Sequence, residues 1–62
     1  MNAPVVIHKD TNEVLGRKVR FMEFPQEIRN LFRPFIKNHD CIFFENGENY
    51  GFIMKSRGVI EE

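Results

Sequence analysis

The clearest pattern in the chain is an apolar stripe at the spacing of an α-helix. Its members fall at positions i, i+3, i+4, i+7 and i+8, and they are Ile28, Leu31, Phe32, Phe35 and Ile36. Pro25 suits the first helical position, and Glu27 lies in the first turn, where its charge favours the helix dipole. Pro34 removes a backbone hydrogen bond from the interior of a helix. We therefore expect a helix from Pro25 with a kink, or a short second helix, at Pro34.

Before this stripe, the pattern predicts a β-hairpin. Residues 5–7 form a β-branched run, residues 10–13 supply turn chemistry, and a second apolar stretch begins at Val14. We expect the second strand to carry a bulge at Gly16 and then to alternate as far as Phe24. One face of this strand would carry Val19 and Phe21, and the other Arg20, Met22 and Phe24.

A second hairpin is predicted after the helix, because the period changes to two from Asp40 onward. Residues 46–49 turn the chain between strands at 41–45 and 50–55. Gly51 marks either a close backbone approach or a bulge. In the return strand, one face would carry Tyr50, Phe52 and Met54, and the other Gly51 and Ile53. Val59 and Ile60 would add a short edge strand.

The summed order of elements is β-β-α-β-β, which predicts an α+β fold. One helix, kinked at Pro34, would cover one face of a four-stranded antiparallel sheet and leave the other face partly open. The alternative is a small SH3-like or OB-like barrel in which the helical segment connects strongly bent strands. No repeat or linker divides residues 1–62, so we expect one small domain, frayed at residues 1–3 and 59–62.

Composition narrows the class of protein. The 62 residues are 42% hydrophobic and 29% charged, which is typical of a folded globular chain. Cys41 is the only cysteine, so no disulfide forms within the chain and a reducing compartment is indicated. The first residues lack a signal-peptide pattern, and no apolar run approaches the ~18 residues of a membrane span. We expect a cytoplasmic protein without membrane contact, stabilised by its seven Phe, by a partner or by self-association.

Candidate catalytic chemistry is sparse. A metal or nucleophile site would have to use His8, His39, Asp40 and Cys41, and none of these has the paired spacing of a structural zinc site. On a strand, His39 and Cys41 would share a face, which leaves a cysteine-dependent activity as a minor hypothesis. A small buried hydrophobe is the usual role of a free cysteine. We predict no enzymatic activity, no cofactor and no metal.

The charges are polarised along the chain although they sum to zero. Residues 17–37 hold six Lys and Arg (Arg17, Lys18, Arg20, Arg29, Arg33, Lys37) against two Glu, whereas residues 38–62 hold two against five Asp and Glu. Arg29, Arg33 and Lys37 fall at i, i+4 and i+8, so they form one row along the helix. The row is either a contact for an acidic partner or a solvated face whose cations meet Asp40 or Glu45.

These patterns favour a small regulatory or inhibitory accessory protein that occupies an acidic surface on a larger protein. Arg29, Arg33 and Lys37 would steer the partner, and exposed aromatic side chains such as Tyr50 would anchor it. The remaining candidates for the contact are Arg17, Lys18 and Arg20. The alternative is a nucleic-acid-binding protein in which Arg17, Lys18, Arg20 and the helix row contact phosphates beside aromatic side chains. A homo-oligomer is a further expectation, because an exposed sheet face would suit a second copy.

Overall fold

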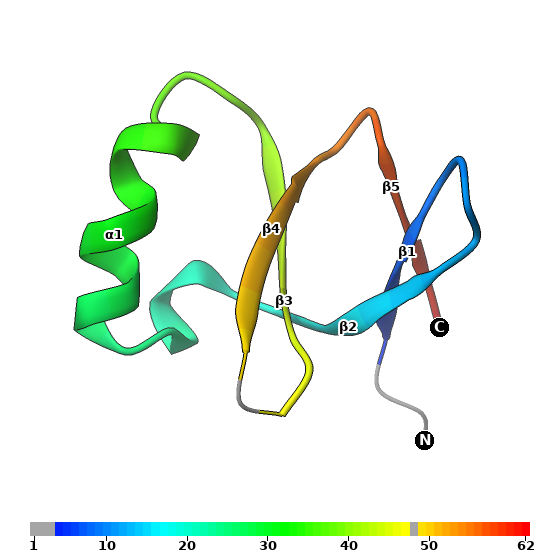
Figure 1. Ribbon diagram of the computed structural model, residues 1–62, viewed down its shortest axis with the longest axis horizontal. Coiled ribbons are helices and arrows are strands. Elements are labelled where there is room, and N and C mark those ends of the chain that lie inside the picture. Colours follow the sequence, from blue (N-terminus) through cyan, green and yellow to red (C-terminus); the bar gives the residue numbers. More distant parts are fainter. Residues whose placement is uncertain (1–3, 48) are drawn as a thin grey trace.

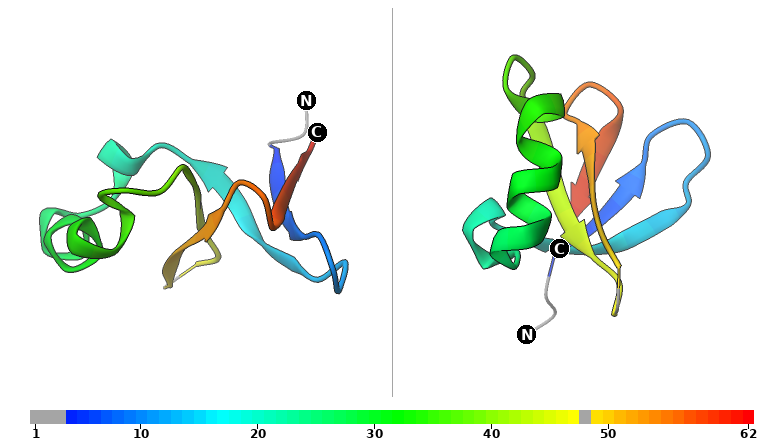
Figure 2. Two further views of the ribbon diagram at one scale, coloured as in Figure 1. Left: turned by 90° about the horizontal axis from the view of Figure 1, so that it is seen from above. Right: turned by 60° about the vertical axis from the view of Figure 1, so that its left-hand side comes forward.

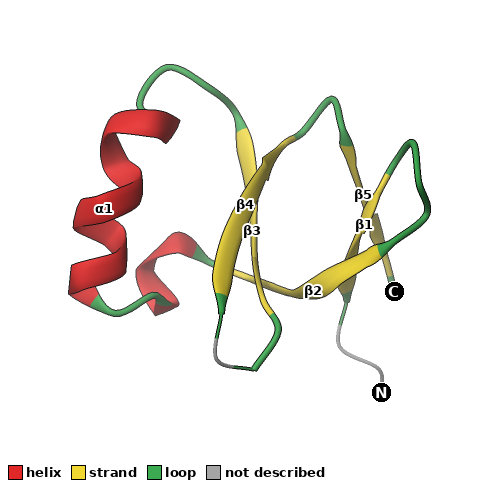
Figure 3. Cartoon of the chain, in the orientation of Figure 1, coloured by secondary structure: helices red, strands yellow, loops and turns green. Residues whose placement is uncertain are grey.

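The computed structural model describes residues 4–47 and 49–62 and contains one antiparallel sheet, one α-helix and one 3₁₀ helix (Figures 1 and 3). The elements are β1 (Val5–His8), β2 (Val14–Val19), η1 (Phe21–Glu23), α1 (Gln26–Ile36), β3 (Cys41–Glu45), β4 (Tyr50–Met54) and β5 (Gly58–Glu61). The five strands follow the order β4-β3-β2-β1-β5. The predicted α+β fold is confirmed, the short edge strand expected at Val59 and Ile60 is β5, and the sheet is not closed into a barrel.

The predicted hairpins form where the turn residues allow them. Asn12 closes the β1–β2 turn at φ 61°, a left-handed conformation that asparagine tolerates. The register slips beside Gly16, because Val6 pairs with Gly16 while Ile7 pairs with Val14. A Cβ at Gly16 would lie 2.5 Å from the carbonyl oxygen of Glu45, so only glycine fits this approach of β2 to β3.

The second predicted strand ends earlier than its alternation suggests. β2 stops at Val19, and residues 21–23 form η1 instead of continuing the strand. The Glu23 carboxylate accepts a hydrogen bond from the backbone N–H of Arg20 at 2.7 Å, which fixes the turn. The prediction that Phe21 lies on one strand face and Met22 and Phe24 on the other is therefore wrong.

The helix is continuous but begins one residue later than expected. Pro25 is the N-cap residue rather than the first helical residue, and its carbonyl accepts the N–H groups of Ile28 and Arg29 at 3.0 Å. α1 then runs through Pro34 to Ile36, and no second helix starts at this proline. Pro34 lies in the last turn, so its missing N–H removes only one bond near the helix end. The alternative of a short second helix is wrong.

Only part of the apolar stripe faces the sheet. Leu31 is 61% exposed and Phe35 is 64% exposed, whereas Ile28, Phe32 and Ile36 are half-buried. α1 stands beside the β3–β4 hairpin at one end of the sheet, while β1 and β5 lie at the other end (Figure 2). Phe32 makes the central contact there, with its ring centroid 5.0 Å from that of Phe52. The helix therefore rests on a narrow line of side chains.

An aromatic cluster fills the space between α1, η1 and the sheet. Phe24, only 2% exposed, is at its centre. Its ring centroid lies 4.9 Å from that of Tyr50 and 5.8 Å from those of Phe21, Phe32 and Phe43. Most of the predicted aromatic residues are thus used for packing, and η1, α1, β3 and β4 are held together by one ring.

The other face of the sheet is folded onto itself. Four strand spacings would separate β4 from β5 by about 19 Å in a flat sheet. Only residues 55–57 link Met54 to Gly58, and this stretch spans about 15 Å at most. The sheet must therefore curl, which brings Gly58 against Ile53 and buries Val6 and Ile42 to 0% and 6% exposure. This face is therefore closed around Val6 and Ile42 but stays partly open at Ile60, which pairs with Val6 and is 39% exposed.

Smaller predictions have mixed outcomes. Gly51 is a site of close approach, since a Cβ there would lie 2.6 Å from the Phe44 ring. Residues 59–61, for which fraying is expected, belong to β5 and pair with β1. Expected fraying at residues 1–3 lies outside the described residues. In the described part of the chain, no helix is long and apolar enough to cross a bilayer.

Candidate functional site

Three of the predicted site residues meet where η1 packs beside α1. Arg20 immediately precedes η1, while Arg29 and Arg33 project from successive turns of α1 toward it. Arg29 contacts Met22, which is 72% exposed, the highest value among the exposed large hydrophobic side chains. We call Arg20, Met22, Arg29 and Arg33 the α1–η1 surface.

Two contacts join the helix cations to η1. The Nη1 atom of Arg29 donates to the Sδ atom of Met22 at 3.6 Å. The guanidinium of Arg33 lies 5.8 Å from the centroid of the Phe21 ring, within the range of a cation–π contact. These contacts set the direction of both guanidinium groups and hold the exposed Met22 side chain between helix and turn.

Arg29 carries an unsatisfied donor. Its Nε atom is buried and has no hydrogen-bond acceptor among residues 4–47 and 49–62. Such a donor costs about 1–3 kcal/mol, because it loses its water without gaining a partner. An apolar side chain of similar length would pack here without that cost, so the local packing does not account for an arginine.

One hypothesis for the row of Arg29, Arg33 and Lys37 is a solvated helix face whose cations pair with Asp40 or Glu45. In the structure these carboxylates take other partners: Asp40 lies 3.8 Å from Lys55, and Glu45 lies 3.1 Å from Arg17. Across the described residues, no carboxylate forms an ion pair with Arg20, Arg29 or Arg33. The only carboxylate within η1 is that of Glu23, which accepts the Arg20 backbone N–H.

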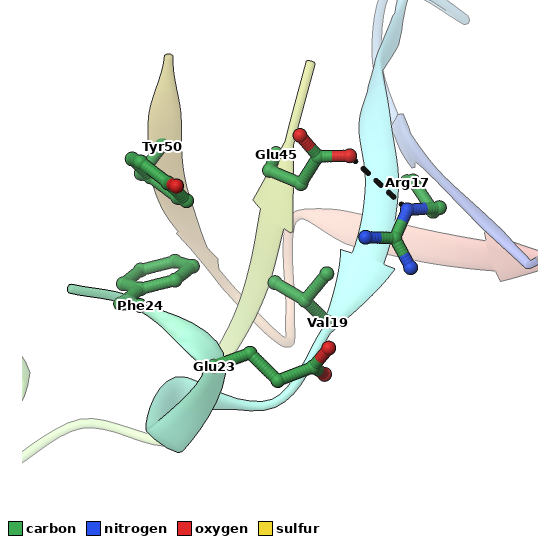
Figure 4. A pocket seen from close by; sticks show the side chains of 6 residues that line it. All are labelled: Arg17, Val19, Glu23, Phe24, Glu45 and Tyr50. Carbon is green, nitrogen blue, oxygen red and sulfur yellow. Dashed lines mark hydrogen bonds and ion pairs between the residues drawn. The ribbon is translucent and has the colours of Figure 1, made fainter. Parts of the chain in front are cut away.

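Arg17 and Tyr50 line a separate hollow of about 100 Å³ (Figure 4). The Glu45 carboxylate at its rim accepts the backbone N–H of Gly47 and the Nε–H of Arg17, each at 3.1 Å. The hydrogen bond from Gly47, and next that from Arg17, lower the pKa of Glu45. Both carboxylate oxygens already have donors, so this group fastens the β3–β4 turn to β2. The remaining lining residues are Val19, Glu23 and Phe24.

The other predicted residues are dispersed. Lys18 pairs with Phe44 and therefore lies on the opposite face of β2 from Arg17. Lys37 is the C-cap residue of α1 and continues the row of Arg29 and Arg33 by one more turn. Tyr50 is half-buried against Phe24, so its ring is largely occupied by packing.

Cys41 lacks the surroundings of a reactive thiol. Burial raises its pKa, and the charge of the adjacent Asp40 raises it further, so the thiolate is disfavoured. His39 is exposed in the turn before β3. Among the residues that the structure describes, no three His, Cys, Asp or Glu side chains are grouped as metal ligands.

No protein-family model, curated protein or solved structure matches this chain. The α1–η1 surface is the candidate functional site that the described residues provide. Sequence periodicity identifies its arginines but assigns Met22 to a strand. The sequence signal for the η1 turn, and with it for the exposed Met22, is the spacing of Arg20 and Glu23. The Glu23 carboxylate, three residues after Arg20, accepts the Arg20 backbone N–H and so caps the turn.

Proposed function

We propose that this protein binds an acidic surface of a larger protein through the α1–η1 surface, as a non-enzymatic accessory protein of the cytoplasm. The observation that carries the proposal is an exposed Met22 in contact with Arg29, with Arg33 one turn further along α1, Arg20 at the start of η1, and no ion pair to any of these arginines in the described chain. Arginine and methionine are enriched in protein interfaces, where an apolar anchor is surrounded by groups that exclude water.

The two kinds of side chain would contribute differently. Arg20, Arg29 and Arg33 would attract carboxylates of the partner over a distance and raise the association rate. Met22 would be desolvated on contact and slow dissociation, because its flexible thioether adapts to an irregular partner surface. A chain of 62 residues would regulate such a partner by covering the surface that it occupies.

The test compares two charge changes on exposed residues. We expect the double variant Arg20→Glu, Arg33→Glu to bind the partner on the order of tenfold more weakly, because like charges would then face each other. Lys9→Glu is the matched control, since Lys9 is exposed beyond β1 and away from η1. Quantitative mass spectrometry of proteins retained from the native lysate should show one species held by wild type and Lys9→Glu and lost by the double variant. Equal retention by all three would contradict the proposal.

A nucleic-acid target makes a different prediction. Phosphate contacts release counterions, so binding would fall steeply with added salt. Fluorescence anisotropy with short labelled single- and double-stranded oligonucleotides, at low and near-physiological salt, separates the two functions. We expect no saturable binding to either, and saturable binding that Arg20→Glu, Arg33→Glu abolishes would replace the proposed function with the nucleic-acid one.

A further inference from the structure

β5 forms an open edge of the sheet. It pairs only with β1 among the described strands. The backbone N–H of Lys9 donates to the carbonyl of Arg57 at 2.8 Å, so the backbone carbonyl of Arg57 faces β1. Along a strand, the backbone N–H and C=O groups of successive residues point alternately to one neighbouring strand and to the other side. The backbone groups of Val59 and Glu61 therefore point to β1, while those of Gly58 and Ile60 point away from the sheet.

We propose that β5 pairs with β5 of a second copy, antiparallel, about a two-fold axis at Val59. Antiparallel pairing requires the outward backbone groups of one strand to meet those of the other. An axis at Val59 satisfies this requirement, because Gly58 of one copy then exchanges hydrogen bonds with Ile60 of the other. In this arrangement the outer edge of β5 is self-complementary, which a two-fold interface requires.

The charges select this register. With the axis at Val59, Arg57 of each copy lies directly opposite Glu61 of the other, so two ion pairs of opposite sign form at the ends of the interface. Both residues are exposed, and neither is in an ion pair within the described part of the chain. The neighbouring register, with the axis at Ile60, would place Val59 opposite Glu61 and lose both pairs.

Exposed apolar side chains continue across the same axis. Val14 pairs with Ile7, and Ile7 pairs with Val59, so these three share one face of β2, β1 and β5. Val14 is 61% exposed and Val59 is 45% exposed. The two-fold axis would set Val59 against Val59 and join the two rows into one apolar band across the combined sheet.

The helices leave this edge accessible. α1 and η1 lie at the β3–β4 end of the sheet, and the β3–β4 hairpin stands between α1 and β5 in Figure 1 and in the left view of Figure 2. Neither helix would therefore meet its counterpart when two β5 strands pair. The outer edge of β4 is different, because α1 stands beside that strand and a second copy paired there would bring two helices together.

Charge reversal with rescue tests the proposal. We expect Arg57→Glu and Glu61→Arg each to weaken dimerisation about tenfold or more, because like charges then lie opposite at both ends. The double variant Arg57→Glu, Glu61→Arg should restore the dimer, since it exchanges the partners of each pair. Sedimentation velocity measures the association, and Leu31→Asp, a change at a side chain exposed on α1, should leave it unchanged.

Disulfide trapping tests the register independently of stability. In a Cys41→Ala background, Val59→Cys should cross-link to itself on mild oxidation, because that pair would have Cα atoms about 4.5 Å apart. Ile60→Cys should not, because Ile60 would lie opposite Gly58. A monomeric wild type, an assembly larger than a dimer, a double variant that fails to recover, or equal cross-linking of both cysteines would each overturn the proposal.

Discussion

The α1–η1 surface and the β5 edge both expose apolar side chains, but their charges are arranged differently. Near Met22, the three cations Arg20, Arg29 and Arg33 outnumber the one η1 carboxylate, that of Glu23. Along β5, Arg57 precedes the exposed Val59 and Glu61 follows it, so the signs differ at the two ends. A surface with an excess of one sign of charge repels its own copy and favours a partner of opposite sign. An edge with both signs, suitably spaced, can pair with itself.

This difference explains why the zero net charge of the chain says little about its partners. The nine basic and nine acidic residues cancel in the sum, yet the cations Arg29 and Arg33 share α1, whereas Arg57 and Glu61 stand at the two ends of β5. The fold separates these two surfaces, because it places η1 beside α1 at one end and β5 on the edge at the other (Figure 1). In this account, the pattern of signs around each exposed apolar side chain determines the kind of partner.

The largest expected effect concerns the packing that supports the α1–η1 surface. Phe24→Ala should lower the free energy of unfolding by about 3–5 kcal/mol, because it removes the ring around which η1, α1, β3 and β4 pack. Urea denaturation measures the loss. Phe35→Ala is the matched control, since Phe35 is 64% exposed, and its change should stay within about 0.5 kcal/mol. Equal losses for both variants would contradict the described packing of α1.

A smaller effect separates binding from stability at Arg29. Arg29→Met keeps an unbranched side chain against Met22 and removes the buried, unpartnered Nε–H. We expect the free energy of unfolding to rise by about 1 kcal/mol while partner binding weakens. Thermal denaturation and the retention assay measure the two quantities. A variant that loses stability would show that Arg29 is kept for packing and would remove one support for the α1–η1 surface.

The smallest effect is a dependence of stability on pH at the hollow between the two regions. The pKa of Glu45 is lower in the folded chain than its ordinary value, so its ionised form stabilises the fold above that ordinary value. This contribution is lost as the pH falls through the folded pKa. Glu45→Gln should therefore lose less stability than wild type between neutral and acidic pH, as measured by the unfolding midpoint at each pH. Parallel curves would contradict the assigned role of Glu45.

The strands were predictable from sequence because their signals are local. Period-two runs and the turn residues Asn12 and Gly47 mark both hairpins, and both turn residues adopt positive φ. The end of β2 was not predictable from alternation, since a single contact from Glu23 to the Arg20 backbone converts the following residues to a 3₁₀ turn. This local hydrogen bond ends the strand, although the alternation of side chains in the sequence continues as far as Phe24.

The exposure of side chains depends on how elements meet, which periodicity does not report. Leu31 and Phe35 belong to a regular stripe, yet α1 contacts the sheet mainly through Phe32 and leaves both exposed. The buried Val6 reflects the curl of the sheet, which follows from the short link between β4 and β5. The candidate site shows the same limit: the helix row was predictable from spacing, whereas its association with Met22 was not.

Sedimentation velocity on wild type, Arg33→Glu and Arg57→Glu is the most direct test of the central claim. It asks whether the signs of the charges on the α1–η1 surface and on the β5 edge determine which of the two pairs with a second copy. Each variant reverses one exposed arginine, at opposite ends of the molecule. We predict that wild type and Arg33→Glu sediment as dimers and that Arg57→Glu sediments as a monomer. A monomeric wild type, or a dimer lost in Arg33→Glu and retained in Arg57→Glu, would contradict it.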